Sequence, residues 1–259
     1  MSRMLTRGFL VALLLSAASP VHAQEQSEER AFRGLAKQKH QDGAQVSTVQ
    51  LEVIEGYAEL SDTGFVKISG EVRNKTGRWI HNPRIMVELL DEHGKPMSVN
   101  SIPVTLQQEL GESRPADAVV ASRTFVPPGE STVFQYIRDA RKIQGQYTGK
   151  HRLSATARFT TRALSVTIEG LTTGKGPGDV LTASGKIKNS GSEECRSPTA
   201  VVGIYKADGK LYTTRTQSPG AYFQKMLPPG QAVEFQFKAL DNPGGNATIK
   251  AWADCQFLD

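Results

Sequence analysis

The chain has 259 residues, 38% of them hydrophobic, and a formal net charge of +5. This charge is mild, and its Lys and Arg residues are not clustered around aromatic residues, which argues against a nucleic-acid-binding protein. Two cysteines alone offer too few ligands for a zinc site.

Residues 1–23 have the pattern of a secretory signal peptide. Arg3 and Arg7 give a positive start, an apolar run follows, and small residues precede an expected cleavage point before Gln24. An uncleaved membrane anchor is the alternative, but the apolar run is shorter than the roughly 20 residues that a membrane span needs. The sequence therefore predicts a periplasmic or secreted, cell-surface protein without a transmembrane segment in the mature chain.

Residues 24–46 form a polar arm that follows this leader. Acidic residues after Ser27 and basic residues at Lys37 and Lys39 suit a short helix, because they complement its dipole. Such a helix is too short to be stable alone. We expect a flexible or partly helical arm, and a tether or docking peptide is the alternative.

One stretch of the chain occurs twice, at residues 69–77 (SGEVRNKTG) and 184–191 (SGKIKNSG). Asn74 and Asn189 are 115 residues apart (189 − 74 = 115). Later landmarks recur in the same order, namely a turn glycine, a Pro-Pro-Gly turn and a closing strand (Gly94 and Gly209; 127–129 and 228–230; 153–159 and 249–257). A repeat unit of this length is a domain rather than a solenoid turn. Asn74 begins a glycosylation sequon, but Asn189 does not, so we interpret both as turn residues.

The strands of each copy have the alternation of a half-buried sheet. In residues 65–73 every second side chain points to one face, which predicts that Lys67, Glu71 and Arg73 point to water. Short strands with regular Gly and Pro turns are typical of an immunoglobulin-like sandwich or a barrel. Residues 174–178 (GKGPG) lack the ending of a phosphate loop, so we expect a hairpin turn there.

The order Gly-x-Val-x-Asn, apolar strand, Asp-Gly-Lys-like turn and Pro-Pro-Gly resembles the FxLYD-type immunoglobulin-like domain of prokaryotic envelope proteins. The eponymous strand would be residues 87–91 and 202–206, with Val in place of Phe in both copies. The resemblance covers the chain from about residue 47 onward. It implies an extracytoplasmic β-sandwich and transfers no catalytic residues.

These observations predict an all-β protein with two tandem immunoglobulin-like β-sandwich domains, at residues 47–160 and 161–259. Only a few residues connect them, which predicts a stiff end-to-end rod. The first copy has 14 more residues between its turn glycine and Pro-Pro-Gly (129 − 94 = 35 against 230 − 209 = 21). This insertion, within residues 105–124, either carries function or is a tolerated loop.

The cysteines, Cys195 and Cys255, align with the apolar residues Ile80 and Ala157 of the first copy. A secreted chain with two cysteines favours a disulfide, and two buried free thiols are the alternative. Closing a loop of about 60 residues stabilises the fold by roughly 4 kcal/mol in the chain-entropy model.

No catalytic motif is present in the sequence, and we expect neither an enzyme nor a cofactor or metal. Binding candidates are an exposed aromatic turn, the inserted loop and a basic loop (Arg78 and Trp79; Glu112 and Arg114; Arg138, Arg141 and Lys142). We expect a non-catalytic binding or scaffolding protein of the cell envelope that contacts another envelope or extracellular protein. The alternatives are a carbohydrate-binding module for surface polysaccharide and a protease inhibitor.

Overall fold

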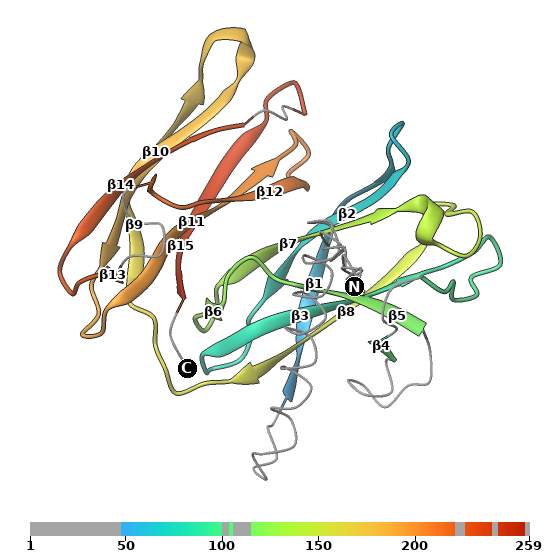
Figure 1. Ribbon diagram of the computed structural model, residues 1–259, viewed down its shortest axis with the longest axis horizontal. Coiled ribbons are helices and arrows are strands. Elements are labelled where there is room, and N and C mark those ends of the chain that lie inside the picture. Colours follow the sequence, from blue (N-terminus) through green and yellow to red (C-terminus); the bar gives the residue numbers. More distant parts are fainter. Residues whose placement is uncertain (1–47, 100–103, 106–114, 221–225, 240–242, 257–259) are drawn as a thin grey trace, which may run out of the picture. The chain divides into compact units, whose positions relative to one another are not determined.

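The polypeptide folds into strands joined by short turns, and this computed structural model describes residues 48–99, 104–105, 115–220, 226–239 and 243–256 (Figure 1). Predictions on residues 1–46, and on Glu112 and Arg114, lie outside the described residues. The strands before residue 160 are β1 (Thr48–Leu60), β2 (Phe65–Arg73), β3 (Ile80–Leu89), β4 (Val104–Thr105), β5 (Pro115–Val120), β6 (Phe125–Val126), β7 (Ser131–Asp139) and β8 (His151–Phe159). The later strands are β9 (Val166–Lys175), β10 (Leu181–Asn189), β11 (Cys195–Tyr205), β12 (Leu211–Gln217), β13 (Met226–Leu227), β14 (Ala232–Lys238) and β15 (Thr248–Gln256). Two short 3₁₀ turns, η1 (Ala140–Lys142) and η2 (Pro177–Asp179), accompany them.

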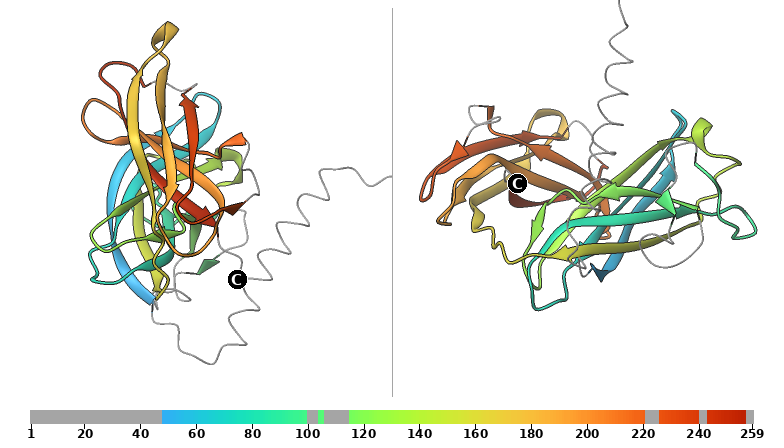
Figure 2. Two further views of the ribbon diagram at one scale, coloured as in Figure 1. Left: turned by 90° about the vertical axis from the view of Figure 1, so that its left-hand side faces the viewer. Right: turned by 60° about the horizontal axis from the view of Figure 1, so that its bottom comes forward.

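The first sandwich is built around one long strand that belongs to both of its sheets. β1, blue in Figure 2, pairs with β8 through Thr48–Leu51 and with β2 from Glu52 to Leu60. The resulting strand order is β4-β5-β3-β8-β1-β2-β7, and β6 pairs with β3. Alternate side chains of these strands fill the space between the two halves, among them Val66, Ile68, Val72, Ile85, Phe134 and Tyr136.

The second sandwich has two separate sheets. One has the order β14-β10-β9, and the other contains β12, β11 and β15, with β13 pairing to β11 (Figure 1). Here the opening strand β9 pairs only with β10, so no strand is shared between the sheets. The fold is therefore all-β, with two immunoglobulin-like β-sandwiches, as the alternation predicted.

The two copies correspond strand by strand. β1, β2 and β3 match β9, β10 and β11, and β5 to β8 match β12 to β15 in order and pairing. β4 has no equivalent among the described strands of the second copy, and it lies in the region of the predicted insertion. The duplication inferred from spacing is thus present in the topology.

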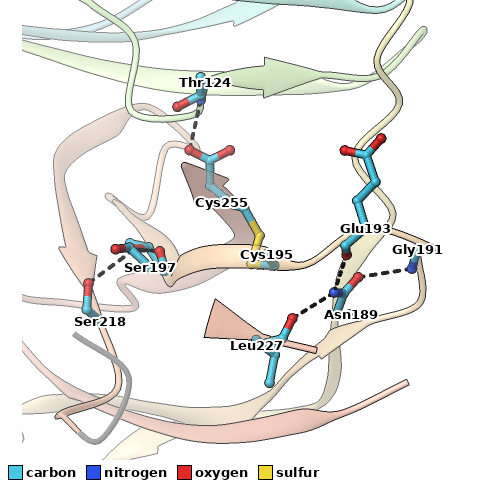
Figure 3. The surroundings of a disulfide bond; sticks show 11 residues. Thr124, Asn189, Gly191, Glu193, Cys195, Ser197, Ser218, Leu227 and Cys255 are labelled. Carbon is cyan, nitrogen blue, oxygen red and sulfur yellow. Dashed lines mark hydrogen bonds between the residues drawn. A yellow bond between two sulfur atoms is a disulfide. The ribbon is translucent and has the colours of Figure 1, made fainter. Parts of the chain in front are cut away.

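The repeated asparagine fastens one turn to another in each copy. The buried amide of Asn74 donates from Nδ2 to the carbonyls of Arg78 (2.9 Å) and Val126 (3.0 Å). Asn189 donates to Glu193 (2.8 Å) and Leu227 (2.9 Å), as Figure 3 shows. We call this arrangement the asparagine clip.

The Pro-Pro-Gly turn completes the clip. The N–H groups of Gly129 and Gly230 donate to the carbonyls of Asn74 (2.8 Å) and Asn189 (2.7 Å). Both glycines have positive φ, 78° and 75°, which a residue with a Cβ adopts only at a cost. The interpretation of both asparagines as turn residues is confirmed.

The repeated Ser-Gly has a steric reason in both copies. A Cβ on Gly70 would lie 2.8 Å from the Phe134 ring, and one on Gly185 would lie 3.1 Å from the Phe235 ring. In each case the phenylalanine is the cross-strand partner of the glycine. The glycine therefore leaves room for the ring of the neighbouring strand.

A further landmark with the same spacing was missed in the sequence. Asn82 and Ser197, again 115 residues apart (197 − 82 = 115), both have positive φ and both precede a proline. Each lies where the pairing of its strand with the closing strand shifts register. Repeated x-Pro dipeptides just before the predicted apolar strands are the signal that could have indicated such bulges.

The disulfide between Cys195 and Cys255 is present, which confirms the predicted pairing (Figure 3). Both residues are about 1% exposed, and they lie in the core cluster of the second sandwich. Ile80 and Ala157 occupy the equivalent positions in the first sandwich and pack together in one cluster. A covalent bond in one copy thus replaces an apolar contact in the other.

Asn189→Ala should lower the free energy of unfolding by about 2 to 4 kcal/mol, because it leaves buried carbonyls without a donor. Asn189→Asp should cost more at neutral pH, because a carboxylate would face those same carbonyl oxygens. Urea unfolding would measure both. Asn246→Ala, at an exposed asparagine in a loop, is the control and should change stability by less than about 0.5 kcal/mol. Equal effects at Asn189 and Asn246 would contradict this role of the clip.

Candidate functional site

The two sandwiches contact each other through β12, which crosses the outer face of β1, β2 and β7. Ser69 Oγ donates to the Leu211 carbonyl (2.6 Å), and Gln135 Nε2 donates to Thr213 Oγ1 (3.0 Å). Ser69 and Gln135 are direct cross-strand partners. The rings of Tyr57 and Tyr212, with centroids 5.2 Å apart, extend the contact to β1. The first sandwich thus contacts β12 through Tyr57, Ser69 and Gln135. We call these three residues the contact row.

On one side of the contact row, the remaining strands of the β12 sheet cover the first sandwich. Val133 of β7 clusters with Val201, Tyr205 and Leu211, all buried. Glu71, predicted to point to water, is instead mostly buried and lies 3.6 Å from the Lys250 ammonium. Burial, together with the nearby carboxylate of Glu71, raises the pKa of Tyr205. Because sheet faces meet here, the expected end-to-end rod is wrong.

A glycine allows this close approach. A Cβ on Gly56 would lie 2.6 Å from the Leu211 carbonyl oxygen and 2.8 Å from the Ser69 carbonyl oxygen. Both atoms belong to the backbone and cannot rotate away. Gly56 lies at the bulge of β1, where the register with β2 shifts. This position therefore limits how closely β12 docks.

The candidate Trp79 lies at the junction of the sandwiches. It is half-buried and packs against the core cluster of the second sandwich, which also includes Phe125 of β6. Its backbone carbonyl accepts a hydrogen bond from the Thr160 N–H (3.0 Å). Its neighbour Arg78 is exposed and lies over the Phe159 ring, 4.2 Å from the centroid. The aromatic turn thus contributes to the packing between the sandwiches.

The basic loop carries less free charge than its sequence indicates. Arg138 pairs with the buried Asp117 of β5, which raises the pKa of the guanidinium. Arg141 pairs with Asp139 (2.6 Å), and this bond lowers the pKa of the carboxyl to about 2. Lys142 is exposed. The neutralising carboxylate Asp117 lies far along the chain, so the sequence pattern alone did not reveal it.

The structure does not bring the two groups of candidates together. Trp79 follows the end of β2 at Arg73, whereas the basic loop lies beside the start of β2, because Phe65 pairs with Asp139. The nine residues of β2 separate them by roughly 30 Å at strand spacing. They therefore belong to different surfaces.

Two large apolar side chains beside the basic loop were missed in the sequence. Phe65 is 37% exposed and Ile137 is 46% exposed. Both lie on the outer face of the sheet, since Ile137 pairs with Lys67 and Phe65 is two residues from Lys67. The alternation that sends Lys67 to water also sends Phe65 there, and this is the signal that could have found it.

A buried carboxyl lies at the contact between the sandwiches. Asp254 of β15 is 6% exposed, and its Oδ2 accepts a hydrogen bond from the Thr124 N–H (2.9 Å). Its Oδ1 has no hydrogen-bond partner among the described residues. Burial raises the pKa of this carboxyl to about 6, partly offset by the Thr124 hydrogen bond.

A histidine network lies near the start of β8. His151 Nε2 is 3.0 Å from Glu55 Oε1, and Nδ1 is 3.1 Å from the Tyr147 hydroxyl. Burial, together with the charge of Glu55, raises the pKa of Tyr147 to about 12. The phenol therefore stays protonated at neutral pH and serves as a hydrogen-bonding group.

Within the described parts of the chain, no three or more His, Cys, Asp or Glu side chains are grouped to hold a metal ion. None of the helices described there is long and apolar enough to cross a membrane.

Comparisons with known proteins identify no family. No family model and no curated protein matches the chain. Among solved structures, red sea bream transglutaminase aligns with 92% of this chain at 11% identity and a TM-score of 0.26. The aligned part is 32% of the transglutaminase chain, so this chain corresponds to about a third of it. A similarity this weak supports no statement about function.

Gly56→Ala should lower the free energy of unfolding by about 1 to 3 kcal/mol, because the new methyl group collides with backbone oxygens. It should also speed amide hydrogen exchange in β12. The matched control is Gly77→Ala, since Gly77 has open space around its Cα and no positive φ. The control should change stability by less than about 0.5 kcal/mol. Unchanged exchange in β12 of the Gly56 variant would contradict close docking.

Asp254 should make the protein less stable as pH rises from about 4 to about 6. The carboxyl of the folded protein binds its proton more tightly than that of the unfolded chain. The loss of stability is therefore absent below the pKa of the unfolded chain and complete above the pKa of the folded protein. The rise in pKa corresponds to a loss of about 3 kcal/mol in the free energy of unfolding. Urea unfolding from pH 4 to pH 8 should show this trend in the native chain, and Asp254→Asn should remove it. The exposed control Asp62→Asn should retain the trend, and its persistence in the Asp254 variant would refute the assignment.

Proposed function

We propose that this protein is a non-catalytic, extracytoplasmic binding or scaffolding protein of the cell envelope, which acts through contacts with another protein. The observation that carries this proposal is the contact between the sandwiches. It combines a buried apolar cluster around Val133 with hydrogen bonds at Ser69, Gln135 and Thr124. Domains joined in this way hold their outer surfaces in a fixed relation, which is what a scaffold needs.

The disulfide supports the extracytoplasmic part of the proposal. Cys195 and Cys255 are bonded, and disulfides form and persist mainly in oxidising compartments such as the periplasm and the extracellular space. The leader pattern at residues 1–23 predicts export to the same compartments. The resemblance to FxLYD-type envelope domains belongs to this proposal and agrees with both points.

Exposed apolar side chains support the protein-binding part. Phe65 and Ile137 are exposed on a sheet face of the first sandwich. Another part of the same face, around Val133, packs against the second sandwich. Apolar groups on such a surface favour protein partners.

Crosslinking in living cells of the native source tests this proposal. A tagged full chain would be crosslinked, captured under denaturing conditions and analysed by mass spectrometry. We expect one reproducible protein partner in the envelope fraction, and none in uncrosslinked cells. Retention of the chain on envelope polysaccharide with no crosslinked protein would reject the proposal in favour of a carbohydrate-binding module. Recovery of the reduced chain from the cytoplasm would reject its extracytoplasmic part.

A further inference from the structure

The second sandwich is open along a side that the first sandwich closes. In the first copy, the opening strand β1 pairs with the closing strand β8 along Thr48–Leu51. Further along the same two strands, His151 Nε2 lies 3.0 Å from Glu55 Oε1 and bridges them. The equivalent strands β9 and β15 lie side by side, but their described residues do not pair. We call the line between β9 and β15 the open seam.

The spacing of the repeat shows what has replaced the bridge. Glu55 corresponds to Gly170 (170 − 55 = 115), and both lie where the ladder of their strand shifts register. His151 corresponds to Ile249 (249 − 151 = 98), because each pairs with the same position of the preceding copy-equivalent strand. The second copy therefore has a glycine and an apolar side chain where the first copy has an ion pair.

Inward-facing apolar side chains along the open seam are incompletely covered. Ile168 of β9, and Ile249 and Ala251 of β15, pack against the core of the second sandwich and are only partly buried. Their cross-strand neighbours include Ile187 and Ile204, which are 0% and 1% exposed, so this face of each sheet turns toward the core. Further apolar side chains placed over the seam would remove more apolar surface from water, which is favourable.

The backbone of β9 has a free edge along this seam. Within the described chain, it forms a ladder with β10 alone, and β9 stands at the end of its sheet. The other described bond to its backbone comes from the Thr172 hydroxyl to the Gly170 carbonyl, at 3.5 Å. Residues 169–175 are all exposed, so neither face of this part of the strand is covered. The hairpin of β9 and β10 extends beyond the neighbouring strands of its sandwich (Figures 1 and 2).

We propose that an extended segment of a partner protein pairs with the free edge of β9 and places apolar side chains over Ile168 and Ile249. This inference rests on the proposed function, because it names the mode of the same protein contact. Backbone hydrogen bonds provide affinity in this mode, and alternate side chains provide specificity. Lys175 Nζ donates to the Gly245 carbonyl (3.1 Å) across the seam and marks one end of the segment's path.

The charges beside β9 indicate that the segment is recognised by its apolar side chains. Lys188 pairs with Glu169 (2.9 Å), and Lys186 lies 3.4 Å from Glu234. Exposed ion pairs of this kind are worth little and leave little net charge beside the edge. The partner segment should therefore alternate apolar and polar residues and favour β-branched side chains. It should lack proline at its centre, since proline cannot donate to the ladder.

A phage-displayed library of random linear peptides, selected on the full chain, tests this inference. We expect enriched peptides that alternate apolar and polar residues. In the free chain, alternate amides of β9 should exchange with solvent fast, because they have no partner at the free edge. A selected peptide should slow the exchange of these amides, because strand addition bonds them. Docking by side chains alone would leave their exchange unchanged.

Matched variants locate the contact. Ile249→Thr keeps a β-branched side chain in β15 and should weaken binding of a selected peptide about threefold or more, because it removes apolar surface. Val120→Thr makes the same kind of change at an exposed residue of β5 in the first sandwich and should leave binding unchanged. Thermal unfolding of both variants would verify that they fold. The exchange measurement uses the native chain, so it decides the question independently of the variants.

Selected peptides without alternation, slowed exchange confined to strands other than β9, or equal effects of the two variants would overturn the inference. A library that yields no binding peptide would overturn it as well. These outcomes are distinguishable from failure of the proposed function, which is decided by crosslinking in cells. A protein partner captured there whose binding is insensitive to Ile249→Thr would retain the scaffold and reject this docking mode.

Discussion

The docking of β12 onto the first sandwich is the constraint on which the rest of the described structure depends. The Ser69 hydroxyl bonds to a backbone carbonyl of the second sandwich, and Gly56 lies directly below it. This single approach decides that Val133 and Glu71 are buried and that Ile137 is exposed. A sheet face that would otherwise be solvated is thereby divided into a covered half and an uncovered half.

The two copies share their turns and differ in how the two sheets of each sandwich are held together. The asparagine clip, the Pro-Pro-Gly turn and the glycine beneath a phenylalanine ring recur in both, because each meets a local requirement of the sandwich. The means of joining the sheets differ. β1 bonds to both halves of the first sandwich, whereas the second sandwich is crosslinked by Cys195 and Cys255. A disulfide thus accompanies the sandwich in which no strand is shared.

The sequence predicted what depends on local pattern. Alternation indicated the strands, the constant spacing of Asn74 and Asn189 indicated the duplication, and the alignment of the cysteines with apolar positions indicated their pairing. It failed where distant segments meet. Glu71 has the pattern of a solvated residue but lies under Lys250, and Arg138 has the pattern of a basic loop but is paired with Asp117. Phe65 could have been recognised as outward-facing from alternation alone, but the burial of Glu71 could not, since no local signal encodes the contact between sandwiches.

The burial of Val133 against Val201, Tyr205 and Leu211 has a consequence for how this protein descends from its single-domain ancestor. A duplicated gene first produces two interchangeable modules, and recombination can add, delete or exchange them freely. Once each copy supplies part of the other's apolar interior, that freedom ends, because a copy transplanted alone would present those side chains to water. The repeats have become complementary halves, so a substitution at this contact in one copy also changes the packing of the other.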